Sequence, residues 1–173
     1  LIVRAQRIAE AAYERLLEKM RRGMTEKQVA ALLNYFMMDC GADELSFETI
    51  AASGVNSASP HAVPTDKPLE NGDFLTLDFG AVLDGYHSDM TRTLVIGDPT
   101  PEMEQVYEAV YYANLDAMQA VRADVGGKLV DSVARSTLGG WGGYDKYFGH
   151  GLGHGVGLEI HEAPTLSRKS TSV

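Results

Sequence analysis

The chain has 173 residues, a length that suits one domain with a hydrophobic core. Its 24 acidic and 15 basic residues give a net charge of -9, which argues against nucleic acid as the main partner. A single cysteine, Cys40, excludes an internal disulfide and is consistent with a reducing compartment, so we expect a cytoplasmic protein. No apolar run is long enough to span a membrane, so no membrane partner is expected either.

Helical periodicity runs through the first forty residues. Apolar side chains recur at three- and four-residue steps over residues 1–22, and Gly23 is expected to end that helix. Residues 25–28 form a capping-box pattern that opens a second helix, which is expected to stop near Gly41. The methionines and phenylalanines of these segments are predicted to be core, so both helices are predicted to be scaffold.

A strand over residues 47–53 is predicted to lead into a polar loop that ends at His61. A lone loop histidine is usually only solvated, so His61 carries little weight by itself. The dipeptide Asp84-Gly85 then predicts a two-residue hairpin turn between an apolar strand, 74–83, and a return strand, 86–96.

This hairpin register places two carboxylates together. It puts Asp78 opposite Thr91 and Gly80 opposite Asp89, so that Asp78 and Asp89 are diagonal neighbours on one face, roughly 7 Å apart at Cβ. Gly80 is expected to leave room for a group between them. Because like charges repel, either one carboxylate holds a proton or a cation lies between the two. A solvent-facing polar surface is the alternative, and the apolar character of residues 74–83 counts against it.

Two further helices are predicted before the most unusual segment of the chain. Thr100 caps the first, with Pro101 at its first position, and it runs to about Val121. The second covers residues 124–138 and is weakened by two glycines. A glycine-rich stretch, 139–144, is expected to be a flexible approach to the next motif.

That motif spans residues 149–162 and has glycine at every odd position from 149 to 157. In an extended backbone, one face would be bare and the other would carry His150 and His154. So many glycines make a helix implausible, and because no glutamate follows His150 the helical zinc-peptidase pattern is excluded. The segment is either a packed strand with histidines as polar filler or a functional site. Three of the five histidines of the chain, His150, His154 and His161, lie in it, which favours a site.

Two carboxylates and imidazoles suit manganese, iron or cobalt better than zinc. Bridging carboxylates favour a paired-metal centre, which lowers the pKa of a shared water and polarises a carbonyl for peptide hydrolysis. Histidines that do not bind metal could stabilise the oxyanion or protonate the leaving amine.

The motifs around Asp78, around Asp89 and over residues 150–162 resemble those of the pita-bread metallopeptidases: aminopeptidase P, prolidase and methionine aminopeptidase, with creatinase as a metal-free relative. The similarity covers nearly the whole chain and includes the spacing from His61. It implies an α+β pita-bread fold and hydrolysis of a peptide substrate. The two histidines His150 and His154 resemble the histidine pair in the branch of the family that cleaves Xaa-Pro bonds at peptide N-termini.

The resemblance implies a role for each candidate residue. Asp78, Asp89 and His154 would be ligands of two divalent metal ions, manganese first, with cobalt or zinc as alternatives. His61 and His161 would act around the scissile carbonyl and leaving group, and His150 would hold the substrate beyond that bond. The resemblance also makes a homodimer plausible.

The chain departs from the family pattern at its end, where two further glutamate ligands are expected. Residues 1–173 are therefore predicted to be a single catalytic domain without its last strands or an N-terminal domain, and inactive by themselves. Three alternatives stay open: an inactive peptide-binding module of the same fold, a methionine aminopeptidase-like enzyme, and a creatinase-like hydrolase without metal.

Overall fold

The computed structural model describes residues 1–172, which contain both helices and antiparallel sheets, as expected for an α+β protein. The chain divides into two compact units, which are described separately. Unit 1 comprises Leu1–Pro99 and Val156–Ile160, and unit 2 comprises Thr100–Gly155 and His161–Val173. The assignment of residues 1–173 to a single catalytic domain stays a prediction.

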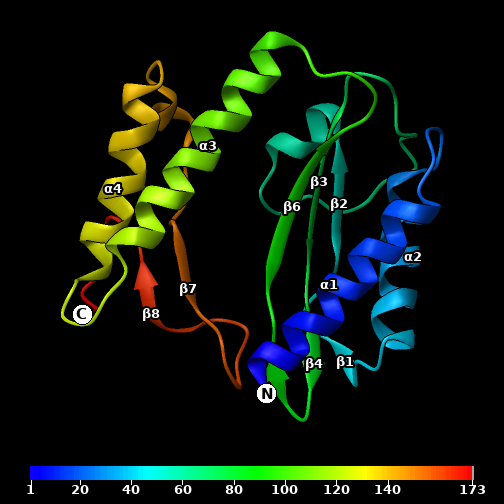
Figure 1. The fold of residues 1–173 in the computed structure, drawn as a ribbon, viewed down its shortest axis with the longest axis horizontal. Helices are drawn as coiled ribbons and strands as arrows, with labels where there is room; N and C mark the ends of the chain where they lie inside the picture. The colour runs from blue at the N-terminus through cyan, green and yellow to red at the C-terminus, as the bar shows by residue number, and fades with distance from the viewer. Residues whose placement is uncertain (173) are drawn as a thin grey trace. The chain divides into compact units, whose positions relative to one another are not determined.

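Unit 1 is built from two helices and two three-stranded antiparallel sheets (Figure 1). One sheet has the strand order β2-β3-β6 and the other has the order β1-β4-β5. The elements are α1 (Ile2–Lys19), α2 (Glu26–Asp39), β1 (Glu44–Leu45), β2 (Ile50–Ser53), η1 (Gly54–Ala58), β3 (Phe74–Phe79), β4 (Ala81–Leu83), β5 (Tyr86–His87) and β6 (Met90–Val95).

The capping box predicted at the start of α2 is confirmed. The Thr25 hydroxyl accepts a hydrogen bond from the Gln28 amide, and the Gln28 side chain accepts one from the Thr25 amide. The predicted end of α1 is wrong by several residues, because Met20 already has extended backbone angles. Gly23, with φ of 87°, belongs to the following turn, where its amide donates to the Leu69 carbonyl.

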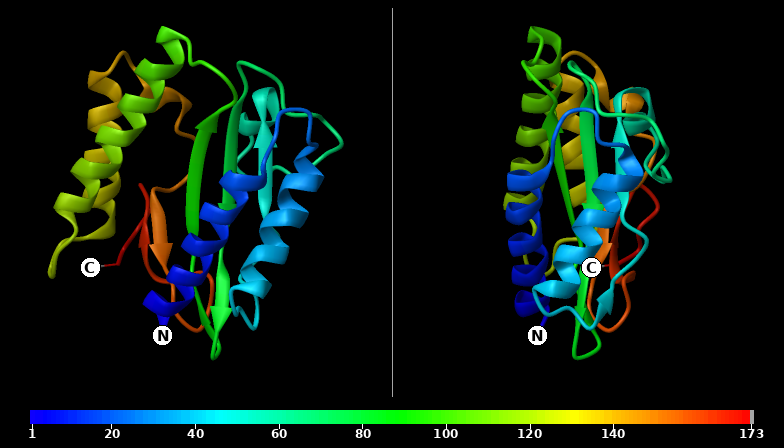
Figure 2. Two further views of the ribbon diagram at one scale, coloured as in Figure 1. Left: turned by 45° about the vertical axis from the view of Figure 1, so that its right-hand side comes forward. Right: turned by 90° about the vertical axis from the view of Figure 1, so that its right-hand side faces the viewer.

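The core of unit 1 lies between its two helices and the β2-β3-β6 sheet, and Figure 2 shows α1 and α2 beside that sheet. Along β3 every second residue is buried, so that Leu75, Leu77 and Phe79 face the helices. Phe36 and Met37 of α2 are buried in the same cluster, which confirms that they are core residues. The apolar alternation of β3 therefore fixes which of its side chains face away from the core, including Asp78.

Unit 2 contains the remaining helices and a two-stranded antiparallel sheet. Its elements are α3 (Pro101–Ala120), α4 (Gly127–Gly140), η2 (Tyr144–Tyr147), β7 (Gly153–Gly155) and β8 (Glu162–Leu166). Helices α3 and α4 lie side by side (Figure 1), and small residues at their contact let the two backbones approach closely. The buried residues there are Ala109, Ala113, Ala117, Val130, Ala134 and Leu138.

The start of α3 is confirmed, with Thr100 capping the Met103 amide and Pro101 in the first turn. The fourth helix begins three residues later than predicted, at Gly127. A side chain at Gly127 would place its Cβ 2.1 Å from the Thr165 carbonyl oxygen, so this glycine permits β8 to contact the helix start. Residues 139–144 are only partly a loop, because α4 continues to Gly140.

The polar loop predicted after β2 begins with a short 3-10 helix, η1, which the sequence did not indicate.

Within residues 1–172, no helix combines the length and the apolar character that crossing a bilayer requires.

Candidate active site

The hairpin that carries the two acids has the predicted register. Leu83 pairs with Tyr86 across the turn, and Asp78 pairs with Thr91. Asp84 and Gly85 both have positive φ, 52° and 78°, as the two-residue turn requires. The Thr91 hydroxyl donates a 2.8 Å hydrogen bond to the Asp78 carboxylate, which orients that side chain on the face away from the core.

The hairpin is not one continuous ladder. Pairing between β3 and β6 stops at Phe79 and Met90, and resumes between β4 and β5. At the break, a Cβ on Gly80 would lie 1.9 Å from the Ser88 carbonyl oxygen. The space that the sequence analysis reserved for a ligand beside Gly80 is therefore occupied by backbone, and that expectation is corrected. Asp89 lies at this break, directly before β6.

The glycine-rich segment forms a strand only over β7, where His154 pairs with Thr165 of β8. A Cβ on Gly155 would lie 2.3 Å from the Ala163 carbonyl oxygen, so the bare backbone at this glycine lets the neighbouring backbone approach closely. Gly149, in contrast, has open space around it. The alternation of glycines therefore has a packing reason at some positions and not at others.

The ring of His154 forms a hydrogen bond with the neighbouring backbone. Its Nδ1 lies 2.9 Å from the Gly155 carbonyl oxygen, and because a carbonyl can only accept, Nδ1 carries the proton. With Nδ1 as the donor, Nε2 is the ring nitrogen that a metal ion would bind. The ring of His161 lies beside it, with 4.2 Å between centroids and 51° between planes. The structure thus brings together two of the predicted site histidines.

His150 is exposed and lies on the edge of a cavity of about 400 Å³ in unit 2. Its ring meets the Phe148 ring edge-on at 4.8 Å, and its Nδ1 is 2.8 Å from the Gly151 carbonyl oxygen. Besides Arg135, whose charge is paired with Asp131, the cavity is lined by three basic side chains, Lys146, Arg168 and Lys169, and one acidic side chain, Asp145. In a protein with a net charge of -9, such a lining favours an anionic group.

A buried ion pair, which the sequence pattern did not indicate, supports this segment. Asp131 of α4 is 1% exposed and accepts hydrogen bonds from Arg135 at 2.7 and 3.1 Å and from the Leu152 amide at 3.2 Å. Arg135 also donates to the Phe148 and His150 carbonyls, both at 2.6 Å, and lies over the Phe148 ring. One helical ion pair therefore fixes the backbone on both sides of His150.

The six candidate residues are divided between the two units. Unit 1 contains His61, Asp78 and Asp89, and unit 2 contains His150, His154 and His161. Over residues 1–172, no group of three or more histidine, cysteine, aspartate or glutamate side chains is arranged to hold a metal ion. The predicted ligand set, Asp78 and Asp89 with His154, draws on both units and stays a prediction.

The chemistry of these donors nevertheless fits a divalent cation. Asp78 and Asp89 belong to one hairpin and could supply oxygen ligands, and Nε2 of His154 could supply a nitrogen ligand. Carboxylates and an imidazole on an α+β scaffold suit a metal-dependent hydrolase.

The comparison with protein families agrees with this class. Residues 1–173 match the model of metallopeptidase family M24 over their whole length, and the chain belongs to this family. Because its members are metallopeptidases, membership implies divalent metal ions.

Individual relatives share both sequence and fold. The chain is 41% identical to an Xaa-Pro dipeptidase from Pyrococcus horikoshii, over 100% of this chain and 49% of that protein. It superposes on an X-Pro aminopeptidase from Thermotoga maritima with a TM-score of 0.95 and 45% identity, over 99% of this chain and 48% of the other. It superposes on the prolidase from Pyrococcus furiosus with a TM-score of 0.94 and 42% identity, over 99% of this chain and 51% of the other.

These similarities confirm the pita-bread fold expected from the motifs. The chain spans about half the length of these relatives.

Proposed function

We propose that this protein hydrolyses Xaa-Pro peptide bonds at peptide N-termini with a metal-activated water. The observation that carries the proposal is that one chain of this fold has a hairpin with two carboxylates, Asp78 and Asp89, and a glycine-rich strand with a histidine whose Nδ1 bonds the backbone. Similarity to proteins named Xaa-Pro dipeptidase, X-Pro aminopeptidase and prolidase supports the choice of substrate. These names do not favour an inactive peptide-binding module or a methionine aminopeptidase.

Asp78, Asp89 and His154 would hold two divalent ions, with manganese as the first choice. When bound, such ions lower the pKa of a shared water and polarise the scissile carbonyl. His161, beside the His154 ring, would hydrogen-bond the carbonyl oxygen or pass a proton to the leaving amine. His61 would act at the same carbonyl, and His150 would hold the substrate beyond the scissile bond, at the edge of the basic cavity.

The test uses the protein produced from the intact gene. Metal is removed with a chelator, and manganese, cobalt or zinc is added back before assay with an Xaa-Pro dipeptide and with a longer peptide of the same N-terminal sequence. We expect cleavage with manganese, and we expect a matched peptide with alanine in place of proline to be cleaved far more slowly. Comparing the two lengths separates a dipeptidase from an aminopeptidase. A protein that binds two metal ions and cleaves neither peptide would refute the proposal.

Finer expectations belong to the same proposal: a homodimer, a cytoplasmic location, and neither nucleic acid nor membrane as a partner. Native mass spectrometry of the metal-loaded protein would count metal ions and subunits in one measurement. A monomer, or one metal ion per chain, would contradict the corresponding part of the proposal.

A further inference from the structure

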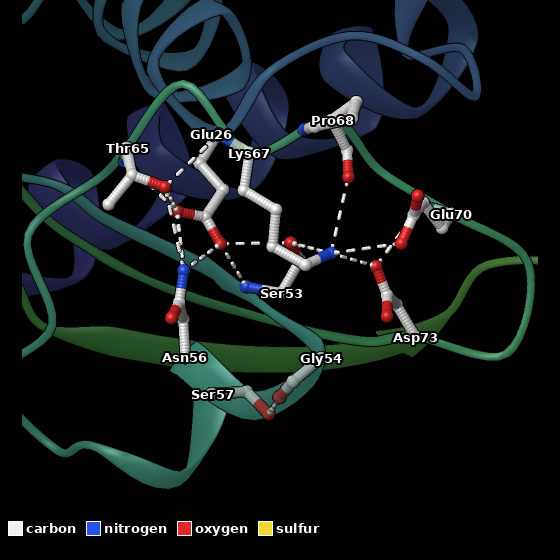
Figure 3. Close-up of polar contacts among 10 residues, drawn as sticks. All are labelled: Glu26, Ser53, Gly54, Asn56, Ser57, Thr65, Lys67, Pro68, Glu70 and Asp73. Carbon is white, nitrogen blue, oxygen red and sulfur yellow. Dashed lines mark hydrogen bonds and ion pairs between the residues drawn. The ribbon is translucent and has the colours of Figure 1, made fainter.

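A buried carboxylate lies at the start of α2, far along the chain from the residues considered above. Glu26 is the first residue of this helix, and its side chain is 0% exposed. A carboxylate without water must receive hydrogen bonds to remain charged. The donors that reach Glu26 come from Ser53, the last residue of β2, and from the loop that follows it (Figure 3), which contains His61.

The two carboxylate oxygens bind the two ends of this loop. Oε1 accepts from the amide and the hydroxyl of Ser53, at 2.6 and 2.8 Å. Oε2 accepts from the amide and the hydroxyl of Thr65, at 2.9 and 2.6 Å. The Asn56 side-chain amide bridges both oxygens, at 3.1 and 3.2 Å. One carboxylate therefore binds both ends of the segment 53–65 and holds them close together.

His61 lies between these two ends and is exposed. The hydrogen bonds described for the intervening residues are local: the Ser59 amide donates to the Asn56 carbonyl, and the Ala62 amide donates to the Ser59 carbonyl. Two sets of hydrogen bonds attach the loop to α2. The Glu26 carboxylate accepts from Ser53, Asn56 and Thr65. The Lys27 amide donates to the Thr65 carbonyl at 3.1 Å. The position of His61 depends on these attachments.

The ends of the loop have a second set of contacts. The Glu26 amide donates to the Lys67 carbonyl at 3.0 Å. The Lys67 ammonium group donates to the Ser53 hydroxyl at 3.1 Å and forms an ion pair with Asp73. The Ser53 hydroxyl therefore links the Lys67 charge to the Glu26 carboxylate, as Figure 3 shows. Burial alone raises the pKa of Glu26, but the hydrogen bonds from Thr65, Ser53 and Asn56 outweigh it and lower the pKa to about 2.

We propose that Glu26 is a positioning residue that holds the His61 loop in its working conformation by binding both loop ends with one carboxylate. The inference rests on the role of His61 in the proposed function. Every group that faces the carboxylate is a donor, so the charged form is required. In Glu26→Gln, the new NH2 group would face the amide of either Ser53 or Thr65. That amide loses its acceptor, and the loop is held by fewer hydrogen bonds at that end.

The first test measures the loop itself by hydrogen exchange of the intact protein. In Glu26→Gln we expect exchange over residues 53–65 to become about tenfold faster or more, the factor that corresponds to losing one hydrogen bond of ordinary strength. Asp66→Asn is the matched control, because it removes one carboxylate charge directly after the loop, at an exposed ion pair with Lys27. Unchanged exchange in Glu26→Gln would overturn the proposal.

The second test asks whether Glu26 acts through His61. In the metal-loaded enzyme we expect Glu26→Gln to lower kcat/KM for an Xaa-Pro peptide about tenfold or more, and to have little further effect in a His61→Ala background. Equal losses in both backgrounds would overturn the inference and leave the proposed function intact. If His61→Ala itself loses no activity, the proposed role of His61 fails, while the exchange result still decides whether Glu26 holds the loop.

A milder variant keeps the test decisive if Glu26→Gln does not fold. Thr65→Val retains the branched shape and removes the hydroxyl that donates to Oε2 and accepts from the Lys67 amide, while the Thr65 amide bond to Oε2 stays. It is expected to show the same changes in exchange and in kcat/KM to a smaller extent. Glu26→Asp, which restores a carboxylate, is expected to recover part of the activity that Glu26→Gln loses. Wild-type exchange in Thr65→Val would overturn the proposal.

Discussion

Asp131→Ala is expected to lower the free energy of unfolding by about 3 to 5 kcal/mol, the cost of removing one partner from a buried ion pair. Asp131 is 1% exposed and the Arg135 side chain 11%, so the substitution leaves a guanidinium group with little water and no counter-charge. It also removes the acceptor of the Leu152 amide. The structure thus supplies two separate reasons for a large loss, an unpaired charge and an unpaired donor.

Urea denaturation followed by fluorescence suits this experiment. Trp141, the only tryptophan of the chain, packs on the unit 2 core and stacks on Tyr112, so it reports on the unit that contains Asp131. Glu10→Ala is the control, because it removes a carboxylate from a more exposed ion pair on α1 and should cost less than about 1 kcal/mol.

The double variant with Arg135→Ala completes the reasoning. If the pair is coupled through burial, removing both partners should cost well below the sum of the two single losses. A loss of about 1 kcal/mol or less for Asp131→Ala, close to that of an exposed pair, would refute the argument that burial makes this pair important.

Three other predictions address different parts of the molecule. The pKa of Glu26 is lowered from 4.5 to about 2, so its contribution to the free energy of unfolding is fully present above pH 4.5 and is lost as the pH falls towards 2. Acid denaturation of the wild type should therefore show a loss of stability of roughly 3 kcal/mol between these pH values, and Glu26→Gln should not show it. Gly155→Ala should destabilise the protein by about 2 kcal/mol or more because of the Ala163 carbonyl, whereas Gly149→Ala, in open space, should change stability by less than about 1 kcal/mol in the same urea titration. Manganese at a hundredfold excess over Kd should stabilise the chelator-treated protein by about 2.7 kcal/mol in thermal denaturation, and an equal effect in His154→Ala would contradict its assignment as a ligand.

The hairpin was predictable because a local signal fixes a long-range arrangement. Asp84-Gly85 favours positive φ at both turn positions, and a two-residue turn leaves one register for everything that follows. The pairing of Asp78 with Thr91 follows from that turn alone. Helix starts at Thr25 and Thr100 were predictable for the same reason, since a cap and its partner lie within one turn.

The supporting contacts of the site were not predictable, because burial decides their meaning. Asp131 and Arg135 have the i, i+4 spacing that exposed helical pairs also have. Glu26 in the first turn of a helix is a common favourable charge, and its donors Ser53 and Thr65 lie far along the chain. Sequence spacing indicated the candidate site residues. It did not indicate the ion pair of Asp131 and Arg135 that holds the backbone around His150, or the contacts of Glu26 with the His61 loop.

The close approach of the Ser88 carbonyl to Gly80 has a consequence for how mutational scans of this protein are interpreted. Any side chain at position 80 meets backbone rather than a flexible group, so a saturation library selected for activity should return glycine alone. Asp89, its predicted neighbour across the hairpin, should be equally intolerant if it binds metal. The two positions would be indistinguishable in such a scan, and only measuring folded protein and bound metal separately would show that one is needed for shape and the other for chemistry.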